Sequence, residues 1–216
     1  MNNSNKQSID NNRILTEQIN LTSTDLDIKS TVDIVKIFSE ADKAPQLAVE
    51  KAIPQIVKAI DEIALRLKSN GRLFYLGAGT SGRLGVLDAS ECPPTFSVSS
   101  EMIQGIIAGG EESLTKSSES LEDCIQLAVS DLNDKKFSKN DVLIGITASG
   151  RTPYVISALT YAKNINALTI SISCVPKNES PISSDIDIRL LTGPEILSGS
   201  TRLKAGTATK MLLNII

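Results

Sequence analysis

Two short loops carry the residues best suited to binding a ligand. Each contains the triplet Ser-Gly-Arg, at residues 81–83 and again at residues 149–151, with threonines beside it. The first loop joins a short apolar run to a helical stretch, and the free N–H groups at a helix N-terminus commonly hold an anion. Hydroxyls and backbone amides suit a phosphate monoester that must be bound and released. We therefore expect a phosphate and sugar site built from Gly79, Thr80, Ser81, Gly82, Ser149, Gly150, Arg151 and Thr152.

These loops have two other interpretations. Ser-Gly and Gly-x-Gly also occur simply because they form turns, and one such loop alone would favour that explanation. Two matching loops favour binding. Residues 77–82 also fit the dinucleotide pattern G-x-G-x-x-G, but the acidic residue expected about 20 residues later is missing. The second apolar run ends instead in Gly109-Gly110, which argues against a nicotinamide enzyme.

A carboxylate follows the first loop in the sequence. The helical stretch is expected to end at Glu91, just before Pro93 and Pro94. A glutamate at a helix C-terminus opposes the helix dipole, so its position beside two rigid prolines indicates a functional rather than a merely solvated group. The chain contains no histidine, which excludes Ser-His-Asp and Cys-His nucleophile systems. Acid–base chemistry is therefore left to Asp, Glu, Lys, Cys or Tyr.

Composition excludes several classes of protein. A net charge of −3 and 3% aromatic residues give no reason to expect a nucleic acid partner. No apolar run is long enough to span a bilayer, and the polar, Asn-rich residues 1–12 do not form a signal or transit peptide. Three cysteines far apart predict neither a disulfide framework nor a zinc site. We expect a cytoplasmic protein that does not bind membranes.

From residue 71 onward, apolar strands alternate with amphipathic helices. This pattern predicts an α/β three-layer sandwich, in which a five-stranded parallel sheet is covered by helices on both faces. We expect flavodoxin-like strand order, 2-1-3-4-5, which places the two loops together where the order reverses. Strands are expected at residues 73–76, 103–108, 142–146, 168–173 and 186–191, with a single helix from residue 112 to about 132.

The chain is expected to have three parts. Residues 1–25 have the composition of a flexible arm, residues 26–70 form helices that pack on the domain, and residues 71–216 form the ligand-binding domain. The helices should be interrupted at Ala41-Asp42 and by Pro54. The last helix ends in apolar sequence without a capping residue, which predicts an exposed apolar face that a further segment or a partner would cover.

Four motifs resemble a known family. Residues 77–85, 88–94, 147–154 and 193–208 are similar to those of the N-acetylmuramic acid 6-phosphate etherases, bacterial enzymes of cell-wall recycling with a sugar isomerase domain. The resemblance runs from about Leu15 to the end of the chain, and the last motif is shared with the animal glucokinase regulatory protein. The family continues into a C-terminal helical region, which the resemblance implies that this chain lacks.

The resemblance implies a reaction. The D-lactyl ether at C3 of a phosphorylated amino sugar would be cleaved to N-acetylglucosamine 6-phosphate and D-lactate, without a metal or cofactor. In the open-chain sugar the C1 aldehyde acidifies the C2 proton, so one carboxylate removes that proton while an acid protonates the departing oxygen. The resemblance assigns these roles to Glu91 and Glu122. From the residues alone, Glu122 is not distinguished from Glu119 or Asp123.

Two further functions remain open. One is a non-catalytic sugar-phosphate sensor like the glucokinase regulatory protein, and the other is a phosphosugar aldose–ketose isomerase, although such enzymes often use a histidine. Domains of this kind commonly meet across a two-fold axis, so we expect a homodimer. Four cations could pair with phosphate or a carboxylate or could form salt bridges elsewhere: Arg83, Arg151, Arg202 and Lys204.

Overall fold

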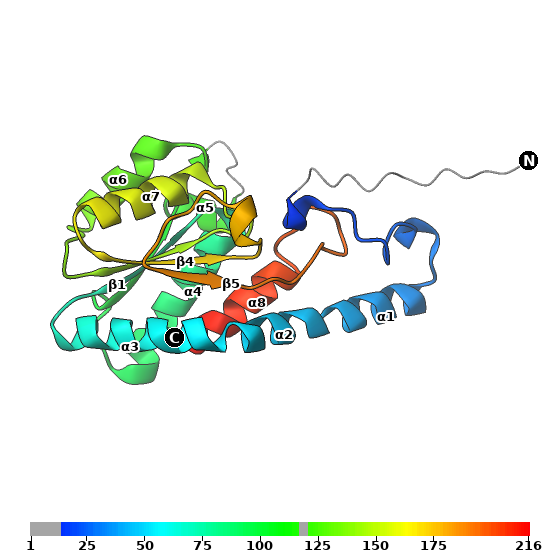
Figure 1. Ribbon diagram of the computed structural model, residues 1–216, viewed down its shortest axis with the longest axis horizontal. Coiled ribbons are helices and arrows are strands. Elements are labelled where there is room, and N and C mark those ends of the chain that lie inside the picture. The colour runs from blue at the N-terminus through cyan, green and yellow to red at the C-terminus, as the bar shows by residue number, and fades with distance from the viewer. Residues whose placement is uncertain (1–13, 117–120) are drawn as a thin grey trace, which may run out of the picture.

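The computed structural model describes residues 14–116 and 121–216, and a five-stranded parallel sheet lies at its centre (Figure 1). The strand order is β2-β1-β3-β4-β5, which confirms the α/β class and the order expected from the sequence. Because β1 lies between β2 and β3, the connection after β1 leads to the strand on one side of it, and the connection after β2 leads to β3 on the other side. The strands are β1 (Leu73–Gly77), β2 (Ile103–Ile107), β3 (Val142–Ile146), β4 (Leu168–Ser173) and β5 (Ile186–Arg189).

Helices precede the sheet and connect its strands. The predicted interruptions at Ala41-Asp42 and at Pro54 are confirmed, and Pro54 is the second residue of its helix, where the missing N–H leaves no helical bond unmade. The helices are α1 (Thr31–Ala41), α2 (Lys43–Lys51), α3 (Ile53–Lys68), α4 (Gly79–Phe96), α5 (Glu112–Thr115), α6 (Ile125–Asp134), α7 (Pro153–Asn164) and α8 (Lys204–Leu213). The described residues also include short 3₁₀ helices at Leu15–Glu17, Leu26–Ile28 and Lys177–Glu179.

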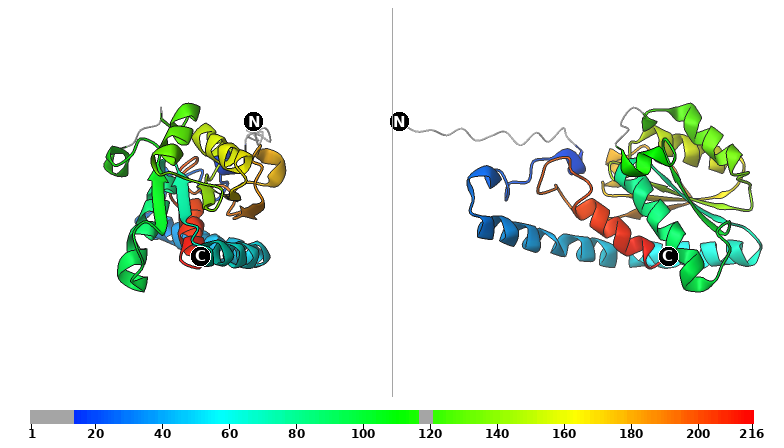
Figure 2. Two further views of the ribbon diagram at one scale, coloured as in Figure 1. Left: turned by 90° about the vertical axis from the view of Figure 1, so that its left-hand side faces the viewer. Right: turned by 180° about the vertical axis from the view of Figure 1, so that it is seen from behind.

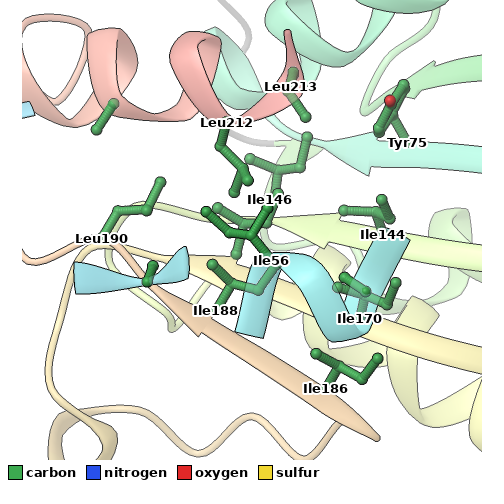
Figure 3. Close-up of a cluster of buried hydrophobic side chains, with 14 of the residues drawn as sticks. Ile56, Tyr75, Ile144, Ile146, Ile170, Ile186, Ile188, Leu190, Leu212 and Leu213 are labelled. Carbon is green, nitrogen blue, oxygen red and sulfur yellow. The ribbon is translucent and has the colours of Figure 1, made fainter. Parts of the chain in front are cut away.

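Both faces of the sheet are buried. Along β1, Leu73 and Tyr75 point into a core shared with α2, α3 and α8, whereas Phe74 and Leu76 point into a second core against α6 and α7. Figure 3 shows the first of these cores, where the isoleucines of β3, β4 and β5 face α3 and α8. A parallel sheet covered on both sides explains why its strands read as continuous apolar runs.

The predicted helix over residues 112–132 is wrong, because two separate helices occupy this region. α5 ends at Thr115, and both Lys116 and Cys124 have extended backbone before α6 begins. At the end of α5 the hydroxyl of Thr115 donates to the carbonyl of Glu112 at 3.4 Å, and side chains that compete for backbone hydrogen bonds in this way disfavour helix interiors. Residues 117–120 themselves lie outside the described residues.

The predicted end of the preceding helix is also wrong. α4 does not stop at Glu91 but continues to Phe96, with Pro93 and Pro94 inside its last turn. Proline has helical φ, so near a helix end it removes only the donors for two carbonyls of the preceding turn. The helix ends where Ser97 adopts a left-handed backbone, with φ +55°, and donates its N–H to the carbonyl of Pro93 at 2.9 Å.

The expectation of an exposed apolar face on the last helix is wrong as well. α8 packs along α2 and against α4 (Figure 2), and Leu212 and Leu213 are almost completely buried in the core beside α3. The covering surface comes from helices near the start of the chain, which the local sequence of α8 does not reveal.

Residues 14–25 of the predicted flexible arm contact the domain, while residues 1–13 lie outside the described residues. The side chain of Asn20 donates to the carbonyl of Pro194 at 3.0 Å, and the Ser23 hydroxyl donates to the carbonyl of Ile196 at 2.8 Å. These partners are more than 170 positions away in the sequence, so composition gives no sign of them.

The first helices form a rod that extends past the sheet (Figures 1 and 2). Over Thr31–Ala41, α1 carries five large apolar side chains, yet none of its residues is buried. None of the helices in the described ranges is long and apolar enough to cross a membrane.

Candidate functional site

A cavity of about 370 Å³ opens at the carboxyl ends of β1 and β3. Gly77 and Ile146, the last residues of these strands, are paired in register, so the loops that follow start side by side. We name this space the switch-point cavity. Five segments line it: Glu17, residues 78–81, residues 122–123, the second loop at residues 147–149 and 151–153, and Thr201. The two Ser-Gly-Arg loops therefore meet at one cavity, as the predicted strand order requires.

Glycine lets the first loop turn closely against β1. A Cβ on Gly82 would lie 2.6 Å from the carbonyl oxygen of Gly77, and one on Gly77 would lie 2.8 Å from the nitrogen of Gly82. Thr80 and Ser81 line the cavity, and so does Gly79, which has φ +53°. Gly82 is buried behind them and does not line the cavity, so it shapes the loop from behind.

Hydrogen bonds among hydroxyls fix the second loop. The hydroxyls of Thr147 and Thr152 lie 2.9 Å apart, and the Ser149 hydroxyl accepts the backbone N–H of Arg151 at 3.2 Å. Gly150 turns the chain with φ +66°, and its carbonyl accepts a hydrogen bond from Ser180 at 2.8 Å. Ser149, Arg151 and Thr152 line the cavity, whereas Gly150 is buried behind it.

The cavity suits an anion on one side. α4 and α7 both begin there, with Gly79 and Pro153 in its lining, so the positive ends of two helix dipoles face it. The exposed Arg151 guanidinium adds a full charge, although its Nε already donates to the carbonyl of Glu179 at 2.9 Å. Together with the hydroxyls, these groups form a site able to accept a phosphate ester.

Three carboxylates lie on the cavity lining: Glu17, Glu122 and Asp123. The carbonyl of Glu122 accepts the backbone N–H of Tyr154 at 3.0 Å, which ties this segment to the first turn of α7. The structure thus brings the predicted Glu122 together with the predicted phosphate loops. A carboxylate and the N-termini of two helices therefore line one cavity.

Family models match most of the chain. The glucokinase regulatory protein N-terminal SIS domain matches residues 55–163, and the SIS domain matches residues 127–216. The N-acetylmuramic acid 6-phosphate etherase of Prochlorococcus marinus (strain NATL2A) is 72% identical over 204 residues, 94% of this chain and 66% of that protein. The protein of the same name from Parasynechococcus marenigrum (strain WH8102) is 57% identical over 209 residues, 97% of this chain and 66% of that protein. This chain belongs to the N-acetylmuramic acid 6-phosphate etherase family. It spans about two thirds of the length of these etherases.

Solved structures agree with the fold of this etherase-family chain. A phosphoheptose isomerase from Francisella tularensis has a TM-score of 0.62 at 17% identity, covering 87% of this chain and 98% of that one. The phosphoheptose isomerase of Neisseria gonorrhoeae has a TM-score of 0.56 at 16% identity, covering 84% of this chain and 96% of that one. At such low identity, these likenesses show the shared architecture and nothing of the reaction.

Glu91 does not lie with the other predicted site residues of the etherase-family chain. It is twelve residues along α4 from Gly79, which is about 18 Å at the helical rise of 1.5 Å per residue. Its side chain is exposed and does not line the switch-point cavity. Leu87 and Phe96 nearby on α4 are also exposed, by 44% and 68%.

The remaining candidates lie outside the switch-point cavity. Arg83 donates to the carbonyls of Leu114 and Lys116, each at 3.0 Å. Its guanidinium therefore stabilises the segment after β2. Arg202 is exposed and outside the cavity lining. Tyr154 is buried in the core against α6.

Lys204 and Glu195 are both buried near the start of α8. The ammonium of Lys204 donates to the carbonyl of Thr192 at 2.8 Å. Glu195 accepts the backbone N–H groups of Lys204 and Ala205, both at 2.9 Å, and so caps the helix. Burial lowers the pKa of Lys204, while the charge of Glu195 opposes that shift.

Glu17 and Thr201 are among the cavity residues that sequence reasoning missed. Thr201 lies in the motif over residues 193–208, which could have pointed to it. Glu17 lies in the arm that was expected to be flexible, and its spacing from the loops carries no signal.

Proposed function

We propose that this chain is the substrate-binding and catalytic domain of a carbon–oxygen lyase. It would cleave the D-lactyl ether of N-acetylmuramic acid 6-phosphate to N-acetylglucosamine 6-phosphate and D-lactate, in the cytoplasm. The observation that carries the proposal is the meeting of both Ser-Gly-Arg loops, two helix N-termini and Glu122 at one cavity. Identity of 72% to a protein named for this activity supports the choice of substrate.

The phosphate would bind where α4 and α7 begin. Backbone N–H groups, the hydroxyls of Thr80, Ser81 and Ser149, and the Arg151 guanidinium line this side of the cavity. Neutral donors with a single guanidinium hold a dianion without making its release slow, because hydrogen bonds to hydroxyls are weaker than full ion pairs. The sugar would then extend toward the carboxylates on the opposite lining.

Elimination followed by addition needs only acid–base groups. A carboxylate takes the C2 proton, the C3–oxygen bond breaks, and a general acid protonates the oxygen that leaves with lactate. Water then adds its oxygen to C3 and a proton returns to C2, so atoms and electrons balance. The family resemblance assigns the acid–base roles to Glu91 and Glu122, and of these two Glu122 lines this cavity. Each positioned acid or base would contribute roughly 10²–10⁴-fold to the rate.

We further propose a homodimer in which a second copy supplies Glu91. Within one chain, Glu91 lies a helical rise of about 18 Å along α4 from Gly79, and it does not line the cavity that Glu122 lines. Two α4 helices packed antiparallel about a two-fold axis would place each Glu91 near the other chain's loop. The exposed Leu87 and Phe96 would supply apolar surface for that contact.

Lactate release from N-acetylmuramic acid 6-phosphate tests the reaction. Glu122→Gln and Glu91→Gln should each abolish release, while both variants keep saturable binding of N-acetylglucosamine 6-phosphate. Binding by the unaltered chain without any release would instead support a sugar-phosphate-binding regulator.

Mixed dimers test the shared site. A Glu91→Gln chain and a Glu122→Gln chain, carrying different tags and purified together, form one intact site and one doubly altered site if each site uses both chains. Such dimers should recover about half of the unaltered activity. No recovery would show that both glutamates act within one chain.

A further inference from the structure

A carboxylate from the N-terminal turn reaches the switch-point cavity. Glu17 is the last residue of the 3₁₀ helix Leu15–Glu17 and lines the cavity, although β1 begins more than 50 residues later. Its side chain is exposed. Within residues 14–116 and 121–216, no lysine or arginine pairs with its carboxylate and no group donates a hydrogen bond to it.

The turn that carries Glu17 is fixed to the cavity wall. The backbone N–H of Leu15 donates to the carboxylate of Glu179 at 2.8 Å, and the carbonyl of the same Glu179 accepts from Arg151 at 2.9 Å. Thr16 is 1% exposed. Because one residue joins the N-terminal turn to the second phosphate loop, Glu17 is held in a set position relative to that loop.

On the other side of Glu17, the glycine at residue 199 leaves room for the Glu17 carboxylate. Gly199 has φ +74°, and a Cβ there would lie 3.0 Å from Oε2 of Glu17. A side chain at this position would be strained by the backbone and would push the carboxylate away. Glycine at residue 199 thus allows the 198–201 segment to approach Glu17 closely.

We propose that Glu17 is a specificity residue, which accepts hydrogen bonds from hydroxyl or amide N–H groups of the bound sugar phosphate. This rests on the proposed function, in which the cavity holds such a sugar. An ionised carboxylate can only accept hydrogen bonds, and it repels a phosphate. Its partner in the cavity is therefore a neutral donor on the sugar, while the phosphate lies at the helix N-termini.

Binding of two probes separates this role from a general effect on the site. Titration calorimetry with N-acetylglucosamine 6-phosphate should show roughly 10- to 100-fold weaker binding for Glu17→Ala, the loss expected for a hydrogen bond to a charged group. Inorganic phosphate should bind Glu17→Ala as tightly as the unaltered chain, or slightly more tightly because a repelling charge is gone. In turnover, KM should rise with little change in kcat, since the contact is made in both ground and transition states.

Two further variants sharpen the result. Gly199→Ala should reproduce the pattern of Glu17→Ala, because its Cβ displaces the same carboxylate. Asp27→Asn is the matched control: this carboxylate also belongs to the N-terminal segment but lines a separate hollow beside Ile196, so it should leave both affinities unchanged. Thermal unfolding of each variant establishes that it is folded.

The outcomes are distinct. Unchanged affinity of Glu17→Ala for N-acetylglucosamine 6-phosphate, in a chain that binds this probe and releases lactate, overturns the inference and leaves the proposed function standing. Equal weakening for the sugar phosphate and for inorganic phosphate also overturns it, since that result indicates a distorted site. An unaltered chain that binds neither probe overturns the proposed function and this inference together.

Discussion

Replacing Gly82 with alanine should distort the switch-point cavity, because Gly82 packs behind the loop that lines it. The new Cβ would lie 2.6 Å from the carbonyl oxygen of Gly77 and 2.7 Å from Cγ1 of Ile107. The carbonyl cannot withdraw freely, because it accepts the backbone N–H of Ala108 at 3.0 Å where β2 ends. The start of α4 must therefore move instead.

The size of the effect follows from these contacts. Relieving them requires a shift of roughly 0.5–1 Å in a close-packed interior, and overpacking of this kind costs about 1–3 kcal/mol of unfolding free energy. Thr80 and Ser81 lie on the part of α4 that shifts. Misplacement of binding groups by about 1 Å can cost on the order of 10²-fold in activity, so phosphate affinity should fall more steeply than stability.

Urea unfolding and calorimetry with N-acetylglucosamine 6-phosphate measure the two effects. Gly110→Ala is the control, because among the described residues no atom beyond its chain neighbours lies within 4 Å of the added Cβ, although Gly110, unlike Gly82, has positive φ, at +65°. It should lose about 1–2 kcal/mol of stability from backbone strain and keep its affinity. Affinity of Gly82→Ala within twofold of the unaltered chain would refute the reasoning, as would an equal loss in Gly110→Ala.

Three other predictions concern the frame around the cavity. Asp141→Asn should cost about 2–4 kcal/mol at pH 7, because the buried carboxylate accepts hydrogen bonds from Arg72 and Ser138. Burial opposes ionisation, but Arg72 and the backbone N–H groups hold the pKa of Asp141 below its ordinary value. The stability that ionised Asp141 adds is present above its pKa in the unfolded chain and is lost as pH falls through its lower pKa in the folded chain. At about pH 3, urea unfolding should therefore show a smaller loss of stability for Asp141→Asn. Tyr154→Phe should cost about 1–2 kcal/mol in thermal unfolding, because its hydroxyl donates to Asp131 at 2.5 Å, and should leave phosphate affinity unchanged. Leu212→Ala should cost about 2–5 kcal/mol in urea unfolding, since this fully buried side chain anchors α8 in the core; a loss below about 1 kcal/mol would show that α8 is peripheral.

The sheet could be predicted because its signals are local. Each strand is a short apolar run between turn residues, and the loops after β1 and β3 repeat one triplet. The expected strand order then placed both loops at the switch point, where ligands bind in open parallel sheets. The prolines of α4 show the limit of such signals. Pro93 and Pro94 indicated a helix end, but the structure accommodates both in the last turn, and Ser97 ends the helix.

Residues brought together by tertiary contacts were not predictable in the same way. Glu17 reaches the cavity because Leu15 and Asn20 bond to partners 164 and 174 positions away. Nothing in a polar, Asn-rich arm distinguishes such a segment from one that stays in solvent. The same limit applies to Glu91, whose sequence distance from the first loop is small but whose helix holds it about 18 Å away.

The cavity is built from both ends of the described chain as well as from its middle. Glu17 precedes the helical rod, Thr201 precedes α8, and the Ser-Gly-Arg loops lie between them in sequence. α8 packs on α2 and α4, so the site is complete only when the rod, α8 and the sheet have assembled. A ligand that needs all of these parts binds the folded chain and not the unfolded one. At a concentration of about 100 times its Kd, it should stabilise the chain by about 2.7 kcal/mol. Loss of the contact between α8 and the core should therefore weaken sugar-phosphate binding even though Leu212 lies outside the cavity.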